Sequence, residues 1–178
     1  RAAMDKARNV GVGFVAIRRN NHTGANAYYV RMAAEEGLIG LAAGNGPPMM
    51  APWGSASPFF STNPLSFGVP AGEERPIIID MATSVSARGK IILAAKNGME
   101  IPLGWAVDEQ GNDTQAPEAA LKGVLLPFGG HKGYAVAVMV EVLAGLLSGA
   151  GYGPTMNEHY RRHDVPVNSG NLFAAVDV

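Results

Sequence analysis

The sequence contains no cysteine, and that absence removes several kinds of chemistry at once. Without thiols there can be no disulfide framework, no cysteine-ligated zinc site and no thiol nucleophile. A cysteine-free chain suits a reducing compartment, and we expect a cytoplasmic protein.

An excess of one charge is lacking as well. The 14 Lys and Arg residues nearly balance the 15 Asp and Glu residues, and the formal net charge is −1. The chain has no basic run and no basic patch interleaved with aromatic residues. Both are typical of proteins that bind nucleic acid, so we expect no nucleic-acid partner.

A hydrophobic run long enough for a membrane span is missing too. The longest apolar stretch, residues 134–151, carries Glu141 near its middle and is interrupted by glycines. A bilayer span needs about 20 consecutive apolar residues. The stretch therefore predicts a helix over 134–147 that is buried on all sides, with Glu141 paired or at a subunit contact. No signal peptide is visible, and we expect no membrane partner.

What the chain does contain favours a packed α/β fold. Over 178 residues it is 47% hydrophobic and 16% charged, which is enough apolar material for a substantial core. The order of the elements is irregular, which indicates a layered α/β fold rather than a regular βαβ series. Periodicity and turn residues predict a helix end at 1–8, strands at 10–17, at 38–44 and just before Asp80, helices at 25–36 and 82–97, a proline-rich loop at 45–70, a hairpin at 110–112 and a loop at 151–170.

Two motifs can be weighed and set aside. "GVGFVA" (11–16) fits the pattern G-x-G-x-x-A, but a Rossmann fingerprint follows a strand and opens a helix, and here the order is reversed. "HYRRH" places His159 and His163 four residues apart, which could bring both to one helix face as metal ligands. Tyr160 stands where a zinc peptidase has its glutamate, so we predict a surface loop and no metal.

Two glycine-rich or strand-end motifs are better candidates. "GGHKG" (129–133) precedes the long apolar helix, where free N–H groups, His131 and Lys132 could bind an anion. The same residues could instead form a solvated loop at the start of a helix. "IIIDMATS" (77–84) puts Asp80 at the end of an apolar strand, where α/β proteins present ligand groups. Asp80 could equally cap the helix that follows.

The segment "RNNHTGANAYY" (19–29) raises the question of what His22 does. It follows an apolar strand and precedes Thr-Gly and a helical segment. An imidazole there can transfer a proton or donate a hydrogen bond to a carbonyl or phosphate oxygen. A solvated loop histidine is the plain alternative.

Six blocks in order resemble the malate/L-lactate dehydrogenase family of the non-Rossmann type. Relatives in that family include ureidoglycolate dehydrogenase, sulfolactate dehydrogenase, diketogulonate reductase and the piperideine-2-carboxylate reductases. The resemblance implies NAD or NADP as cofactor, a small 2-hydroxy or 2-oxo carboxylic acid as substrate, and a homodimer. The blocks are "NNHTGANAYYVRMAAEEGLIGLA", "GNGPPMMAPWG", "STNPLSFGVP", "DMATSVSARGKI", "IPLGWAVDEQGN" and "LPFGGHKGYAVAVMVEVLAGLLSGA".

The resemblance also implies roles for particular residues. His22 would be the catalytic acid/base within this chain, or a cofactor contact. The residues that would contact the cofactor are His22, Thr23, Gly24, Ala25, Asn26, Thr62, Asp80, Met81, Ala82, His131 and Lys132. This chain departs from many relatives at Thr23, where they have Phe, and at Gly44 and Gly46, where they have hydroxyl-bearing residues.

The resemblance predicts a fold and a domain division. We expect a non-Rossmann layered α/β nucleotide-binding domain with a mixed sheet, plus a long buried helix of an otherwise missing helical domain. The divisions are 9–127 for the NAD(P)-binding domain, 128–150 for that helix, and 151–178 for a return segment and strand. The family's N-terminal helical region and C-terminal segment have no counterpart in this sequence. Two alternatives stay open: a non-catalytic nucleotide-binding or dimerising fragment, and a metal-dependent hydrolase built on His159 and His163.

Overall fold

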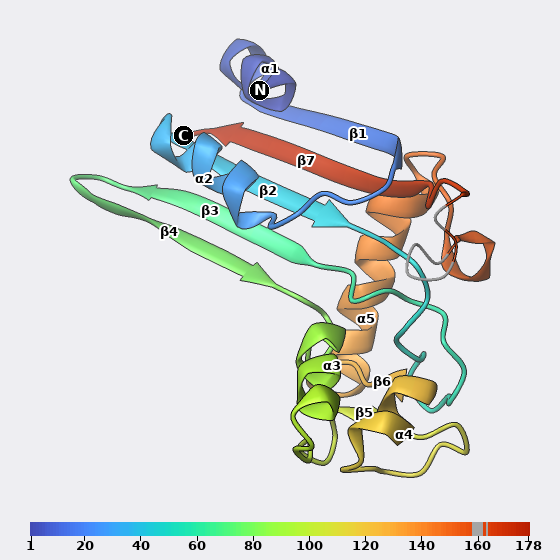
Figure 1. Cartoon of the computed structure of the whole chain (residues 1–178). Helices are drawn as coiled ribbons and strands as arrows, with labels where there is room; N and C mark the ends of the chain where they lie inside the picture. Colours follow the sequence, from blue (N-terminus) through green and yellow to red (C-terminus); the bar gives the residue numbers. More distant parts are fainter. Residues whose placement is uncertain (158–161, 163) are drawn as a thin grey trace.

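The chain folds around a five-stranded sheet in the order β1-β7-β2-β3-β4 (Figure 1). The structure is a computed structural model, and it describes residues 1–157, 162 and 164–178. The strands of this sheet are β1 (Val12–Asn20), β2 (Leu38–Gly44), β3 (Leu65–Ala71), β4 (Glu74–Met81) and β7 (Ser169–Asp177). A second, two-stranded sheet pairs β5 (Ala106–Val107) with β6 (Val124–Leu125). The helices are α1 (Ala2–Val10), α2 (Ala27–Glu35), α3 (Arg88–Lys96), α4 (Pro117–Lys122) and α5 (His131–Val140), with a π-helical segment η1 (Glu141–Leu146) and a 3₁₀ helix η2 (Gly153–Thr155).

The predicted layered α/β class is confirmed, but the predicted mixed sheet is antiparallel in all its described pairings. The reason lies in the last strand. β1 and β2 are joined through α2 and run parallel to each other, as in a crossover unit, but they are not neighbours. β7 lies between them and is antiparallel to both. Insertion of a C-terminal strand cannot be deduced from the local pattern of the strands that it separates.

One face of the sheet is covered by α1 and α2, and a row of small residues lets them approach closely. Gly13, Ala175, Gly40 and Gly68 stand opposite one another across four strands. A Cβ on Gly13 would lie 2.0 Å from a backbone oxygen of α1, and Cβ atoms on Gly40 and Gly68 would lie 2.9 Å and 2.7 Å from the Val30 carbonyl in α2. Larger residues in this row would push both helices off the sheet.

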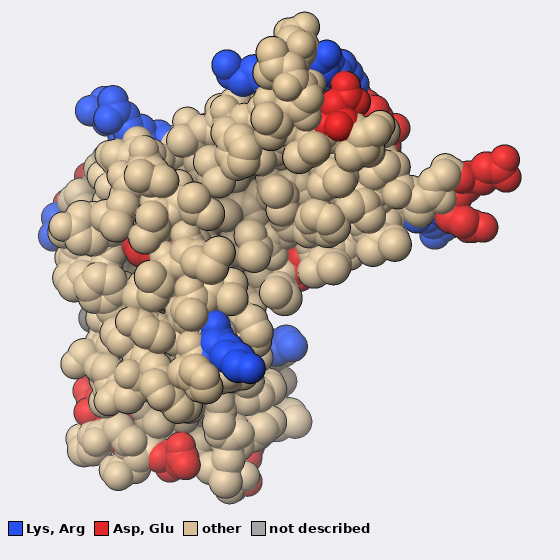
Figure 2. All heavy atoms as spheres, turned by 180° about the vertical axis from the view of Figure 1, so that it is seen from behind, with Lys and Arg blue, Asp and Glu red and all other residues tan. Residues whose placement is uncertain are grey.

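The opposite face of the sheet is apolar and largely open. Phe14, Ala174, Leu41, Phe67 and Ile79 form one row across all five strands. Phe14 is 58% exposed and Ile79 48% exposed. Figure 2 shows a broad surface without charged side chains on this side of the molecule. The η1 end of the long helix covers a part of this face, where Val140 and Ala144 pack on Ala43, Leu65 and Leu172.

A second apolar core lies beyond the sheet and is built from α3, α4, the small sheet and the proline-rich loop (Figure 1). Its buried members are Met50, Phe60, Ile91, Ile101, Ala106, Ala120, Leu125 and Ala137. Ala137 belongs to α5, and further along the same helix Val140 and Ala144 pack against the sheet. The long helix therefore joins the two cores.

Two helices differ from their predicted form. α3 begins at Arg88 rather than at residue 82, because Thr83 bonds to the carbonyls of Thr62 and Asn63 and holds the preceding segment out of a helix. The long helix is not buried on all sides, since Met139 is 60% exposed. Its apolar composition reflects contact with two cores on one side and an open apolar strip on the other. No helix among the described residues has the length and apolar character that crossing a membrane would require.

The remaining predictions meet the structure as follows. "GVGFVA" begins at Gly11, the C-cap of α1, and continues into β1, so the order that excluded a Rossmann fingerprint is confirmed. His159 and His163 lie outside the described residues. The division at residues 127/128 and 150/151 stays a prediction.

Candidate functional site

The loop that follows β1 is tied to the end of β7. The Asn20 side-chain amide donates to Thr23 Oγ1 (3.0 Å) and to Asn171 Oδ1 (2.9 Å), and the Thr23 hydroxyl donates to the same Asn171 oxygen (2.8 Å). Ser169 donates to the carbonyl of Asn20 (2.8 Å). These four side chains fix where the loop leaves the sheet, so the residues between Asn20 and α2 have a defined position.

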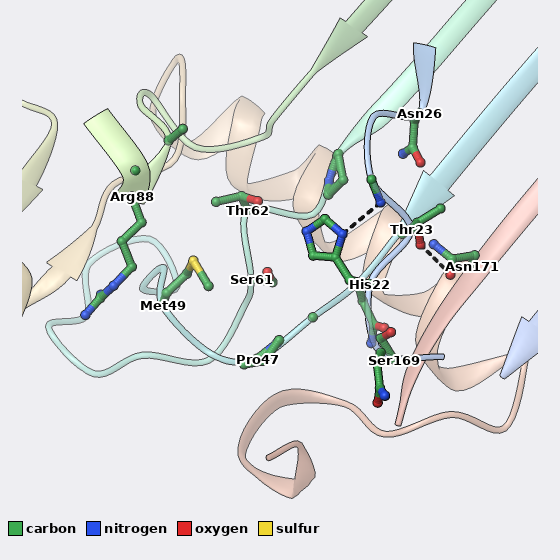
Figure 3. A pocket seen from close by; sticks show the side chains of 18 residues that line it. His22, Thr23, Asn26, Pro47, Met49, Ser61, Thr62, Arg88, Ser169 and Asn171 are labelled. Atoms are coloured by element: carbon green, nitrogen blue, oxygen red, sulfur yellow. Dashed lines mark hydrogen bonds between the residues drawn. The ribbon is translucent and has the colours of Figure 1, made fainter. Parts of the chain in front are cut away.

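His22 lies in this loop with one ring nitrogen already engaged. The backbone N–H of Gly24 donates to His22 Nδ1 at 2.8 Å (Figure 3). Gly24 has φ +77°, a conformation that glycine adopts without strain, and this turn directs its N–H to the ring. Because Nδ1 accepts a hydrogen bond, the neutral ring carries its proton on Nε2.

α2 begins at the same loop, and its first turn holds an unusual side chain. Asn26 is 2% exposed, and neither its amide nitrogen nor its amide oxygen has a hydrogen-bond partner among the described residues. Buried amides in folded proteins are nearly always hydrogen-bonded. Asn26 also lines the pocket described below, so its unused donor and acceptor belong to a wall of that pocket.

Asp80 caps this helix rather than the one that follows it in sequence. The Ala27 N–H donates to Asp80 Oδ2 (2.8 Å), and Ser66 donates to Oδ1. A carboxylate is stabilised at a helix N-terminus by the free N–H groups and by the helix dipole. The cap alternative from the sequence therefore needs amendment: Asp80 is a cap, but of α2, whose first residue lies 53 positions earlier. The ligand alternative stays a prediction.

These elements border a pocket of about 240 Å³ (Figure 3). The ring of His22 is turned toward Thr62 across it, and Arg88 lies at the other end. Arg88 donates to the carbonyl of Leu121 (3.0 Å) and is the one Lys or Arg among the described lining residues. The lining residues are Asn21, His22, Thr23, Gly24, Asn26, Gly44, Asn45, Gly46, Pro47, Met49, Ser61, Thr62, Pro64, Ala87, Arg88, Gly89, Ser169 and Asn171.

Two of the departures noted in the sequence have a structural counterpart here. A Cβ on Gly44 would lie 2.5 Å from Asn171 Nδ2, and one on Gly46 would lie 2.8 Å from Ser61 Oγ. The space that a side chain would take at these glycines is occupied by an amide and a hydroxyl from other segments. The Asn171 amide and the Ser61 hydroxyl therefore supply polar groups to the pocket wall beside Gly44 and Gly46.

The structure brings together part of the predicted site. His22, Thr23, Gly24, Asn26 and Thr62 all line the pocket. The other predicted residues, Ala25, Asp80, Met81, Ala82, His131 and Lys132, are not among the lining residues. Of these, Asp80 is joined to the pocket through α2. The part that they play in cofactor binding stays a prediction.

The start of α5 forms a separate surface. His131 and Lys132 are exposed in its first turn, after Gly129 and Gly130, which both have positive φ. The His131 ring lies edge-on to Trp53, with centroids 6.2 Å apart. α5 has ten residues, and its first turn offers backbone N–H groups beside the Lys132 ammonium.

Sequence reasoning missed several lining residues. Ser169 and Asn171 come from the last strand and reach the site through sheet pairing, for which the sequence carries no local signal. Arg88 stands in the quoted block "DMATSVSARGKI", and its charge at a predicted helix was the signal that could have found it. Among the described residues, no three His, Asp or Glu side chains are grouped so that they could hold a metal ion.

The sequence matches the malate/L-lactate dehydrogenase family over residues 1–178, and the chain belongs to that family. It is 44% identical over 175 residues to L-sulfolactate dehydrogenase of Methanothermobacter thermautotrophicus, which covers 98% of this chain and 51% of the relative. It is 45% identical over 175 residues to malate/(S)-sulfolactate dehydrogenase of Methanothermus fervidus, again over 98% of this chain and 51% of the relative.

A solved structure extends this similarity to the fold. The crystal structure of delta1-piperideine-2-carboxylate reductase from Pseudomonas syringae superposes with a TM-score of 0.90 at 40% identity, covering 98% of this chain and 53% of that one. The chain thus spans about half the length of the relatives that it matches.

Proposed function

We propose that this chain forms the dinucleotide-binding part of an NAD(P)-dependent oxidoreductase for small 2-hydroxy or 2-oxo acids of the malate or lactate type. One observation carries the proposal: the buried, unpartnered amide of Asn26 lines the same pocket as His22 and Thr62. Family membership supports the reaction class, because the matched relatives include dehydrogenases of malate and sulfolactate.

The groups present fit a nicotinamide dinucleotide. Asn26 offers an unused donor and acceptor, as a ring carboxamide or a ribose requires. The Asp80 carboxylate lies at the start of α2, where its oxygens could accept hydrogen bonds from ribose hydroxyls. The α5 start with Lys132 suits a phosphate group, because free N–H groups and a positive charge meet there. When bound, the dinucleotide would donate or accept the hydride.

His22 is the candidate for the reacting end of the ligand, and its hydrogen bond to Gly24 distinguishes two roles. When the ring exchanges a proton at Nε2 between its neutral and its doubly protonated form, Nδ1 carries a hydrogen in both states. That hydrogen cannot coexist with the Gly24 N–H that donates to Nδ1. An acid/base role therefore requires the His22–Gly24 contact to open during the reaction, whereas a hydrogen-bond donor role does not. The geometry favours the donor role.

Arg88 supports an acidic ligand. Its guanidinium is the positive charge at the far end of the pocket, and guanidinium groups bind carboxylates and phosphates with two parallel hydrogen bonds. We propose Arg88 as the anchor of the acidic group of the ligand in this pocket.

The test is to titrate the protein with NADH and NADPH by calorimetry and to follow turnover with malate, lactate, sulfolactate and cyclic imino acids. Affinity for neither cofactor would contradict the proposal. Binding of a cofactor without turnover of any acid would favour the alternative, a non-catalytic nucleotide-binding fragment. Arg88→Gln should weaken acid binding more than cofactor binding.

His22→Ala and His22→Gln separate the two roles of the histidine. A proton-transfer group contributes about 10²–10⁴-fold to turnover, so a loss of that size in kcat for both variants would establish acid/base chemistry. A change confined to KM, with partial retention in the glutamine variant, would establish His22 as a donor that positions the ligand.

A homodimer and a cytoplasmic location complete the proposal. The open apolar face of the sheet, with Phe14 58% and Ile77 57% exposed, is typical of a surface that is covered in an assembly. Light scattering after gel filtration should give twice the chain mass, and Ile79→Lys should shift it toward the monomer. A monomer at micromolar concentration would contradict the dimer. Cell fractionation tests the location.

A further inference from the structure

Glu141 is a buried carboxylate in an otherwise apolar helix, and its partners are amides. It is 3% exposed, and none of the ion pairs among the described residues involves it. Its oxygens accept from Asn45 Nδ2 (3.0 Å), from Asn63 Nδ2 (2.7 Å) and from the Gly153 N–H (3.3 Å). Burial of a charge without a cation is unfavourable, and the three hydrogen bonds from Asn45, Asn63 and Gly153 offset that cost.

The two asparagines belong to the two segments that wall the His22 pocket. Asn45 is flanked by Gly44 and Gly46, and Asn63 is flanked by Thr62 and Pro64; all four neighbours line the pocket. Asn63 is fully buried, so it holds its segment from behind while its neighbours face the ligand side.

Each asparagine is also fixed in the orientation that Glu141 needs. Asn45 Oδ1 accepts from the Gly170 N–H (2.8 Å), and its Nδ2 also donates to the Gly151 carbonyl (2.9 Å). Asn63 Nδ2 also donates to the Ala137 carbonyl (3.0 Å). If either amide were rotated by 180°, its oxygen would face a backbone carbonyl oxygen and a Glu141 oxygen. Each Nδ2 group therefore needs an oxygen acceptor at the position that Glu141 occupies.

The backbone conformation at Asn63 and at Glu141 also supports a functional role. Asn63 has φ +34°, a strained conformation for a residue other than glycine, which persists when surrounding contacts hold it. Glu141 begins the π-helical segment η1, and π segments occur frequently at functional sites.

We propose that Glu141 is a positioning residue that holds both walls of the His22 pocket in register through Asn45 and Asn63. It touches neither ligand nor reacting atoms; it sets the separation between the Gly44–Pro47 wall and the Ser61–Thr62 wall. The inference rests on the proposed function for the identity of the ligand, but the positioning itself can be read without one.

Glu141→Gln is the sharpest variant, because it keeps the shape and replaces one acceptor oxygen with an NH₂ group that must face an asparagine NH₂. We expect NADH or NADPH affinity to fall about 10- to 100-fold, as displacement of binding groups by about 1 Å can cause. We also expect faster hydrogen exchange at two backbone amides that hold the walls. The Asn45 N–H donates to the Gly170 carbonyl, and the Thr83 N–H donates to the Thr62 carbonyl.

Val140→Ala is the matched control. Val140 is the neighbouring residue, is 1% exposed and packs on the sheet without bonding to either wall. It should lower thermal stability while leaving cofactor affinity within about twofold and the two amides protected. If Glu141→Gln lowers stability as Val140→Ala does and both lose affinity equally, Glu141 is merely structural and the inference fails. Unchanged affinity and unchanged exchange in Glu141→Gln would also overturn it.

Asn63→Gly gives a second route should Glu141→Gln not fold. Glycine tolerates the positive φ, so the variant removes the amide and keeps the backbone conformation. It should reproduce the loss of affinity and the exposure of the Thr83 amide. In the double variant, the two losses should be less than additive, because Glu141 acts through Asn63. If the wild-type protein binds neither cofactor, the proposed function fails, and the exchange measurements alone decide the role of Glu141.

Discussion

Replacement of Asn26 by alanine should stabilise the ligand-free protein and weaken its ligand binding, which is the reverse of what most buried substitutions do. The amide is 2% exposed, and its donor and acceptor have no partner in the part of the chain that the structure describes. A buried polar group without a partner costs about 1–3 kcal/mol. Although Asn26 stands at the N-cap position of α2, its side chain makes no capping bond, so no cap is lost.

The expected size follows from two opposing effects. Asn26→Ala removes the desolvation penalty of the amide and leaves a small cavity, which offsets part of the gain at about 24 cal/mol per Å³. We expect a net gain on the order of 1 kcal/mol, or about 2–4 °C in Tm for a chain of this size. Ligand affinity should fall about tenfold, since one or two hydrogen bonds of about 0.5–1.5 kcal/mol each are lost.

Urea denaturation without ligand and calorimetric titration with NADH and NADPH measure both effects. Asn20→Ala is the control, because Asn20 ends β1 at the start of the same loop and its amide donates to Thr23 and Asn171. That variant should be destabilised. A destabilised Asn26→Ala protein with unchanged affinity would refute the idea that the orphaned amide is kept for a ligand.

Three further predictions concern other parts of the chain. Lys132→Ala should weaken dinucleotide binding by about 1.5–3 kcal/mol in calorimetry without a change in Tm, because the side chain is exposed; unchanged affinity would remove α5 from the cofactor site. Gly170→Ala should destabilise the fold by roughly 1–3 kcal/mol in urea, since its Cβ would lie 1.9 Å from the Ala144 carbonyl oxygen, whereas Gly89→Ala, with open space around it, should gain about 0.5 kcal/mol. The pKa of Asp108 is lowered from 3.8, chiefly because backbone N–H groups of its turn donate to the carboxylate. The stability that this carboxylate contributes is therefore present above pH 4 and is lost as the pH falls further. Asp108→Asn should accordingly flatten the acid end of a profile of stability against pH.

Elements fixed by local sequence were predicted well. The strand at 38–44 has the observed bounds, because an apolar run lies between Gly37 with φ +80° and the start of the proline-rich loop. The helix predicted at 25–36 is observed at Ala27–Glu35. In both cases the residues that start and stop the element are its own neighbours in sequence, so the signal is local.

Elements fixed by distant contacts were not. The segment after Asp80 has helical composition but stays irregular as far as Ala87, because Thr83 bonds to the loop about twenty residues earlier. The position of β7 between β1 and β2 depends on pairings between residues at least 127 positions apart in the sequence. Neither contact leaves a periodic pattern in the sequence.

The candidate site combines both kinds of information. The contiguous motif at residues 22–26 could be recognised as a unit, yet its geometry is set by side chains from elsewhere: Asn171 from β7 holds Thr23, and Asp80 from β4 holds the first turn of α2. A contiguous motif can therefore predict candidate ligand-binding residues. The polar groups that orient those residues come from distant strands and can be identified only from the assembled sheet. Because β7 supplies both a sheet partner for β1 and the anchor for the loop after it, pairing of this strand and formation of the pocket are one event. The pocket should accordingly be absent from any folding intermediate in which β7 has not yet inserted.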